Sequence, residues 1–190
     1  MALHDTPASM LKESLVETLI AAKFCANFDK TKSDEFPNGN GCLGYPSAIL
    51  LFSIVDSIGS YLRGDKFFLI DLDGKKTYIK DDGWEHFKVL NSSFFEQNLS
   101  EQILKYIYQK ARSFLVHNAI LGKDVILMPN NDKLPKENDT QVFFIQQADT
   151  GEKIWISIRE LHKLCEDAVS KFKDKIDNIV PNSRQGKNFK

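Results

Sequence analysis

A chain of 190 residues with a 42% hydrophobic share, including 14 phenylalanines, is long enough for one domain with a substantial core. At this length neither a metal ion nor a disulfide is needed for stability. The formal net charge of −1 provides no overall attraction to nucleic acid, so any RNA binding requires a local basic patch.

Three cysteines, Cys25, Cys42 and Cys165, are widely spaced and form no CxxC pair. This pattern is typical of free thiols in a reducing compartment, although a disulfide between two of them stays open. No signal peptide is evident at the N-terminus. The most apolar run, residues 48–58, is too short to span a bilayer and contains Asp56. We therefore expect a cytoplasmic protein with no cofactor, no metal and no association with membranes.

Two helices are predicted in the first third of the chain. Ser9 can cap the first, whose apolar residues recur at helical spacing until the turn-rich loop of residues 34–41. The second begins around Pro46, runs to about Arg63 and stops at Gly64. It is apolar nearly all round, so we expect it to lie at the centre of the fold.

The next segment, residues 65–83, fits either a hairpin with a tight Asp-Gly turn or an irregular excursion. Short helices follow at 84–91 and 93–97. A long helix then opens at Ser100, continues to about Leu121 and is ended by Gly122.

Residues 123–158 change character and are predicted to form a small antiparallel β insertion of three short strands: 124–128, 141–145 and 153–158. A final amphipathic helix is predicted from 159 to about 179, followed by a flexible polar tail at 181–190. The elements together indicate a single, mainly α domain over residues 1–180: a bundle of four to five helices that carries a β insertion.

The long helix carries Arg112 and His117 in its last turns. A guanidinium binds phosphate through a planar fork of donors, and an imidazole transfers protons near neutral pH. On an ideal helix the two side chains lie off the core face, about 140° apart. One helix cannot close both around one phosphate unless it distorts, whereas two such faces in a dimer can form a shared cleft.

Other polar residues lie near this pair. Ser113 is one turn from His117, and Lys110 and Tyr106 continue the same stripe. Lys105 and Lys110 are candidates to hold flanking phosphates, with a plain solvated helix surface as the alternative. We expect Lys105, Lys110 and Tyr106 to be the RNA-contacting residues if the helix binds RNA.

Asp56 lies in an otherwise apolar helix, where an unpaired carboxylate is costly. Arg112 is the expected partner, and a core Tyr or Ser, or water, is the alternative. His86 lies beside Trp84 and Phe87, which indicates a packing role.

The motif Arg112-Ser113-x-x-x-His117, preceded by Ile-Tyr-Gln-Lys-Ala and followed by Asn, resembles the signature of the HEPN superfamily. An earlier apolar helix with an embedded acid, here Asp56, also resembles that family. The resemblance covers about residues 10–121 and the final helix. It implies a four- or five-helix bundle, often dimeric, in which many members are metal-independent endoribonucleases.

The resemblance also implies roles for individual residues. His117 is then the catalytic acid and base, Arg112 binds phosphate, Ser113 is a supporting polar group and Asp56 is the orienting acid. Two features depart from the family: Ala119 stands where some toxin-like members have tyrosine, and the β insertion is not part of the minimal bundle.

These patterns predict a metal-independent endoribonuclease that cleaves single-stranded RNA by attack of a ribose 2′-hydroxyl. Its expected partners are RNA and a second copy of the chain, joined through the helix that carries Arg112 and His117; no partner protein is indicated. The alternatives are a non-catalytic dimeric HEPN-like scaffold, and a protein-interaction module whose strand insertion adds to the edge of a partner's sheet.

Overall fold

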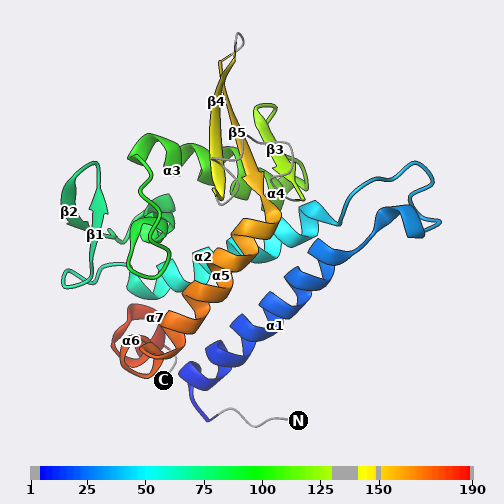
Figure 1. Ribbon diagram of the computed structural model, residues 1–190. Coiled ribbons are helices and arrows are strands. Elements are labelled where there is room, and N and C mark those ends of the chain that lie inside the picture. Colours follow the sequence, from blue (N-terminus) through cyan, green and yellow to red (C-terminus); the bar gives the residue numbers. More distant parts are fainter. Residues whose placement is uncertain (1–4, 130–140, 149–150, 189–190) are drawn as a thin grey trace.

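The computed structural model describes residues 5–129, 141–148 and 151–188 (Figure 1). The described chain is mainly helical, as predicted. Helix α2 (Gly44–Leu62) lies at the centre, where α1 (Pro7–Asn27), α5 (Ile158–Lys173) and the 3₁₀ helix η2 (Gly83–Asn91) pack against it. The bundle is therefore built around the helix that the sequence placed at its core.

The predicted long helix is a rod of three joined segments: α3 (Glu101–Ile107), the π-helical segment η3 (Tyr108–Ser113) and α4 (Phe114–Asn118). The remaining helical pieces are short and lie at the loops and the C-terminus: η1 (Lys30–Lys32), α6 (Ile176–Asn182) and α7 (Arg184–Lys187). Of the two short helices predicted after the hairpin, only the first is present, as η2. Residues 93–95 form a turn, and 96–97 have no regular secondary structure.

Helix α1 begins with a capping box in which Thr6, not Ser9, is the N-cap. The N–H of Ser9 donates to Thr6 Oγ1 at 3.1 Å, and the Ser9 hydroxyl accepts from the Thr6 N–H at 3.3 Å. The prediction of Ser9 as the cap was wrong because Pro7 already fits the first helical turn, where its missing N–H costs nothing.

Helix α2 is buried along most of its length. By length and apolar composition it is the one helix among the described residues that could cross a membrane, and half of its apolar stretch is buried inside the protein. Helix α2 is longer than the apolar run of residues 48–58 that the sequence analysis judged too short to span a bilayer. Because α1, α5 and η2 cover α2, packing accounts for its apolar side chains, which include Leu51, Phe52, Ile54, Val55, Ile58 and Leu62.

Strands β1 (Leu69–Leu72) and β2 (Lys75–Tyr78) form an antiparallel hairpin. The turn residues Asp73 and Gly74 have φ angles of 50° and 74°. Two successive positive φ angles are the requirement of a type I′ turn, which Asp-Gly meets at low cost. The alternative that the sequence left open is therefore decided in favour of the hairpin.

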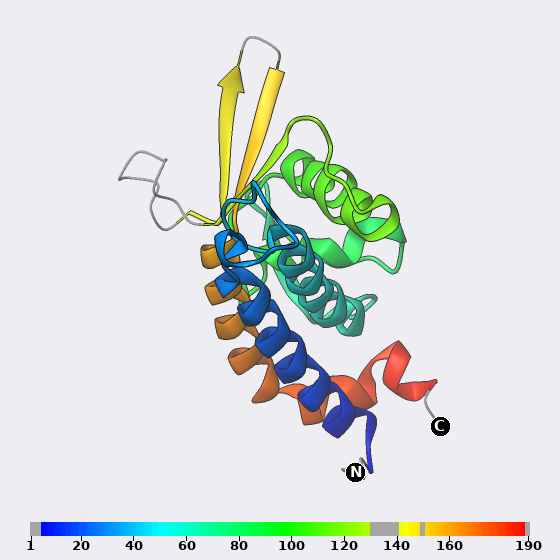
Figure 2. The same cartoon turned by 90° about the vertical axis from the view of Figure 1, so that its right-hand side faces the viewer.

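The predicted insertion contains its three strands, β3 (Val125–Met128), β4 (Phe143–Ala148) and β5 (Gly151–Ser157), in the order β3-β5-β4. Strands β4 and β5 are antiparallel as predicted, but β3 and β5 are parallel, so the sheet is mixed. Successive strands run in opposite directions, and β3 pairs with β5 and not with β4, the next strand in the chain. The β4–β5 hairpin projects away from the helices (Figure 2).

The predicted flexible tail is helical as far as Lys187. The Ser183 hydroxyl caps α7 by accepting the N–H of Gly186 at 3.0 Å, and Arg184 forms an ion pair with Asp81. The composition of residues 181–190 is polar, and this misled the prediction. The segment is held by a cap and by a partner far away in the sequence.

All three cysteines, Cys25, Cys42 and Cys165, are free thiols. Burial raises the pKa of each, most strongly for Cys165, which is fully buried against α2. The expectation of free thiols is confirmed, and the buried Cys165 thiol behaves as a small apolar side chain.

A buried lysine ties η2 to the start of α3. Lys88 Nζ donates to Glu85 Oε1 at 2.9 Å and to Glu101 Oε1 at 2.7 Å, and lies 4.9 Å from the centre of the Trp84 ring. Burial lowers the pKa of Lys88, but the hydrogen bonds to Glu101 and Glu85 outweigh it, so the pKa is raised. The hydrogen bond from Lys88 lowers the pKa of Glu101.

The lowered pKa of Glu101 predicts an acid-dependent contribution to stability. The free energy of unfolding that Glu101 contributes is present above its ordinary pKa of 4.5 and is lost as pH falls through the lowered value. Urea unfolding should show Glu101→Gln less stable than the wild type at about pH 7, with the difference decreasing as the pH falls below 4.5. Glu96→Gln, which removes an exposed ion pair with Lys171, is the control. A Glu101 difference that does not change with pH would contradict the assignment.

Candidate functional site

The π-helical segment η3 interrupts the rod where the predicted motif begins. A π segment adds a residue to one turn and rotates everything that follows, and such segments are frequent at functional sites. Along the rod, Leu104, Ile107, Ala111 and Leu115 are buried, whereas Asn118 at the end of α4 is exposed. Arg112, which the ideal helix placed on the outer face, has a side chain only 18% exposed. The outer-face placement missed this burial, because it considered an isolated helix and not the contact of Arg112 with Asp56 on α2.

Arg112 is paired with Asp56, the partner predicted from the sequence. Arg112 Nε donates to Asp56 Oδ2 at 2.5 Å, and the Asp56 side chain is 17% exposed. The guanidinium carbon also lies 5.3 Å from the centre of the Tyr108 ring, a cation–π contact. Within the described part of the chain the terminal amino groups of Arg112 have no hydrogen-bond partner. The side chain is thus held by Nε, and its outer donors remain for a ligand.

His86 completes this cluster, and the sequence-based view of it as a packing residue missed that role. His86 Nε2 lies 2.8 Å from Asp56 Oδ1, and Nδ1 lies 3.0 Å from the carbonyl oxygen of Gly83. The ring also makes an edge contact with Tyr108, 5.7 Å between centres. The Asp56 carboxylate therefore bridges groups from η2 and η3.

Gly59, one turn after Asp56 on α2, permits the close approach of η2. A Cβ at Gly59 would lie 2.1 Å from the carbonyl oxygen of His86. No side chain fits in that space. Gly59 in an otherwise bulky apolar helix is the sequence feature that could have indicated a closely packed element here, although it does not name His86.

We expect Gly59→Ala to destabilise the protein by about 1–3 kcal/mol, because the new methyl group forces η2 away from α2. This outcome opposes the intrinsic preference of a helix for alanine. The matched control is Gly44→Ala at the first residue of α2, where the nearest atom to a new Cβ is 3.8 Å away. Urea unfolding of both variants is the measurement, and equal stabilities would contradict the prediction.

His117 lies apart from the cluster. It is exposed near the end of α4, and it has no hydrogen bond or ion pair with other described residues. The helix ends here because Ala119 adopts a left-handed conformation with φ of 54°, so the predicted end at Gly122 was too late. Gly122 instead follows a reversal of the chain and donates its N–H to the Lys110 carbonyl at 2.8 Å.

One chain therefore does not bring His117 into contact with Arg112. Two large apolar side chains near His117 are also exposed, Val116 at 43% and Ile120 at 54%. The end of α4 therefore leaves apolar surface exposed beside His117.

The remaining predicted site residues are engaged in local contacts. The Tyr106 hydroxyl lies 3.5 Å from Asp124 Oδ2; burial and this carboxylate raise the pKa of Tyr106. Lys110 Nζ lies 5.4 Å from the centre of the Phe114 ring. Lys105 is exposed, and the half-buried Ser113 hydroxyl has no hydrogen bond to any described residue. The structure does not gather Ser113 or these RNA-contact candidates around Arg112.

Across the described ranges no group of three or more His, Cys, Asp or Glu side chains is placed to hold a metal ion. The chain matches no protein-family model, no curated protein and no solved structure. The case for a function therefore rests on the residues themselves.

Proposed function

We propose that this protein is a metal-independent endoribonuclease of the HEPN type that cleaves single-stranded RNA, and that its helical bundle is HEPN-like. The observation that supports the proposal most directly is the Asp56–Arg112 ion pair. It joins two residues 56 positions apart in the chain, and the sequence predicted both of them for the same site. A guanidinium oriented by a carboxylate and a neighbouring ring suits the recognition of phosphate.

The proposed chemistry needs one proton-transfer group and one cation. The ribose 2′-hydroxyl attacks the adjacent phosphorus, the bond from phosphorus to the 5′-oxygen breaks, and the products carry a 2′,3′-cyclic phosphate and a 5′-hydroxyl. His117 moves the protons, and the terminal amino groups of Arg112 neutralise the charge that develops on the phosphoryl oxygens. Asp56, which His86 contacts through its other carboxylate oxygen, holds the guanidinium in place, and Ser113 is proposed as a supporting polar group.

A second copy of the chain would bring a His117 side chain close to Arg112, which a single chain does not do. His117, Val116 and Ile120 form an exposed surface on α4 that a twofold-related copy would cover. In such a homodimer His117 of one chain can approach Arg112 of the other. The proposal therefore includes a composite site at a dimer interface, in a protein that acts in the cytoplasm.

The test is incubation of single-stranded RNA with the purified protein in EDTA. The proposal predicts cleavage that leaves 2′,3′-cyclic phosphate ends, together with a solution mass of two chains. Intact RNA at high protein concentration, with a dimeric mass, would favour the non-catalytic scaffold. A monomer that leaves RNA intact would contradict both.

A further inference from the structure

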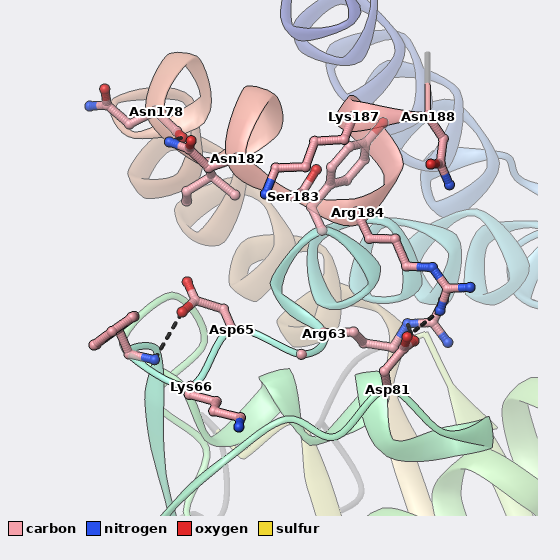
Figure 3. Close-up of a pocket in the computed structure, with 14 residues that line it drawn as sticks. Arg63, Asp65, Lys66, Asp81, Asn178, Asn182, Ser183, Arg184, Lys187 and Asn188 are labelled. Atoms are coloured by element: carbon pink, nitrogen blue, oxygen red, sulfur yellow. Dashed lines mark hydrogen bonds and ion pairs between the residues drawn. The ribbon is translucent and has the colours of Figure 1, made fainter. Parts of the chain in front are cut away.

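A second polar surface lies at the far end of α2, away from the predicted motif. There an open hollow of about 780 Å³ separates the segment that follows α2 from helices α6 and α7 (Figure 3). Four cationic side chains line it: Arg63, Lys66, Arg184 and Lys187. We refer to this surface, together with Phe67 in its lining, as the C-terminal hollow.

Positive charge exceeds negative charge in the C-terminal hollow. Asp81 lies between Arg184 and Arg63, and its oxygen is 3.7 Å from Arg63 Nε (Figure 3). That distance is too long for a hydrogen bond, so the buried Nε donor of Arg63 has no partner in the described structure. Arg63 and Arg184 share the single carboxylate of Asp81, which leaves a net positive charge there for an anionic ligand.

The other charged groups leave two ammonium groups unpaired. Asp65, the remaining carboxylate, accepts the backbone N–H of Phe67 at 2.9 Å and so stabilises its own turn. Lys66 and Lys187 form no ion pair with described residues and reach the hollow from the loop and from α7 (Figure 3). The hollow is therefore equipped for a ligand with more than one negative charge.

Phe67 adds an aromatic surface to these cations. Its side chain is 96% exposed, the most exposed of the large hydrophobic side chains in the described chain. It cannot turn inward, because its neighbour Phe68 occupies the inner position and stacks on Phe94 with 5.7 Å between ring centres. Phe67 lies in the turn before β1, which its own N–H stabilises by donating to Asp65 Oδ1. An exposed aromatic ring beside cations is the composition of a platform for single-stranded nucleic acid.

We propose that the C-terminal hollow binds a segment of single-stranded RNA, with phosphates at Arg63, Lys66, Arg184 and Lys187 and a base stacked on Phe67. The choice of RNA as the occupant rests on the proposed nuclease function. The side-chain amides of Asn178, Asn182 and Asn188 also line the hollow and can bond to bases and sugars. A membrane surface would place the cations on an open face around Phe67, whereas here they line a concavity.

The hollow and α4, which carries His117, lie on different sides of the molecule (Figure 1). The RNA segment bound at the hollow is therefore separated along the strand from the bond that is cleaved. A dinucleotide fills only the cleavage site, whereas a longer strand can reach both surfaces.

The experiment measures binding by fluorescence anisotropy with a labelled oligoribonucleotide of about 20 nucleotides, 2′-O-methylated throughout so that it cannot be cleaved. We expect Phe67→Ala and the double variant Lys66→Ala/Lys187→Ala each to bind roughly tenfold more weakly than the wild type. The matched control is Lys75→Ala/Lys173→Ala, which removes the same charge at two exposed positions elsewhere. Phe67→Trp should retain binding and Phe67→Leu should not, because only the former keeps a ring for stacking.

Three outcomes would overturn the proposal. These are unchanged binding in the Phe67 and Lys66/Lys187 variants, an equal loss in the control pair, and Phe67-dependent binding to anionic lipid vesicles without binding to the oligonucleotide. Cleavage is assayed separately with an unmodified dinucleotide, which the hollow variants should cleave at the wild-type rate. Loss of strand binding at the hollow and loss of catalysis are thereby measured independently, so failure of either proposal is distinguishable from failure of the other.

Discussion

His117→Ala is expected to lower the rate of RNA cleavage by at least about 100-fold, because a positioned acid–base group contributes that much or more to the chemical step. The fold should not change, since the side chain is exposed and has no bonded partner among the described residues. Cleavage rates and circular dichroism spectra of the two proteins are the measurements. Gln102→Ala, an exposed change on α3, is the control.

Arg112 offers a second test of the same centre. Arg112→Lys keeps the positive charge but loses the fork of donors that can hold Asp56 and a phosphate together. In a composite site, mixing Arg112→Ala and His117→Ala chains should restore part of the activity, because one of the two sites in a mixed dimer then has both groups. Retention of full activity in His117→Ala would end the proposed mechanism.

Asp56→Ala is expected to reduce the free energy of unfolding by about 3 kcal/mol. The change removes the common partner of Arg112 and His86, whose side chains are only 18% and 10% exposed. Both would then face one another as donors without an acceptor. Asp56→Asn should cost less, because its amide oxygen still accepts one hydrogen bond.

Urea unfolding of the Asp56 variants provides the measurement. The control is Asp71→Ala, which removes an ion pair with Lys76 between side chains that are 49% and 69% exposed. Such exposed pairs contribute at most about 1 kcal/mol. If Asp56→Ala cost no more than Asp71→Ala, the cluster would not be a stabilising centre of the fold.

The elements that the sequence predicted well depend on local patterns. The apolar surface of α2, the Asp73-Gly74 turn and the β4–β5 strands all follow from periodicity or turn chemistry within a few residues. The pairing of Asp56 with Arg112 was also predictable, because a carboxylate in an apolar helix needs a cation. The HEPN resemblance and the catalytic roles stay predictions.

The predictions that failed involve partners far apart in the chain or a change in helix geometry. Nothing local marks His86 as the second partner of Asp56, since η2 reaches α2 only through tertiary packing at Gly59. Arg112 lies in a π-helical segment and is covered through its contact with Asp56 on α2, and an ideal isolated helix shows neither.

The local pattern of the chain was thus sufficient to indicate a mainly helical protein, its central helix and the β4–β5 hairpin, and it named Arg112 as a candidate partner of Asp56. Tertiary structure alone assembled the three-group cluster, separated His117 from it, and brought the polar tail against Arg63 and Asp81 to form the C-terminal hollow. The physical reason is that periodicity and turn preferences act over a few residues, whereas burial and charge pairing depend on which distant segments pack together.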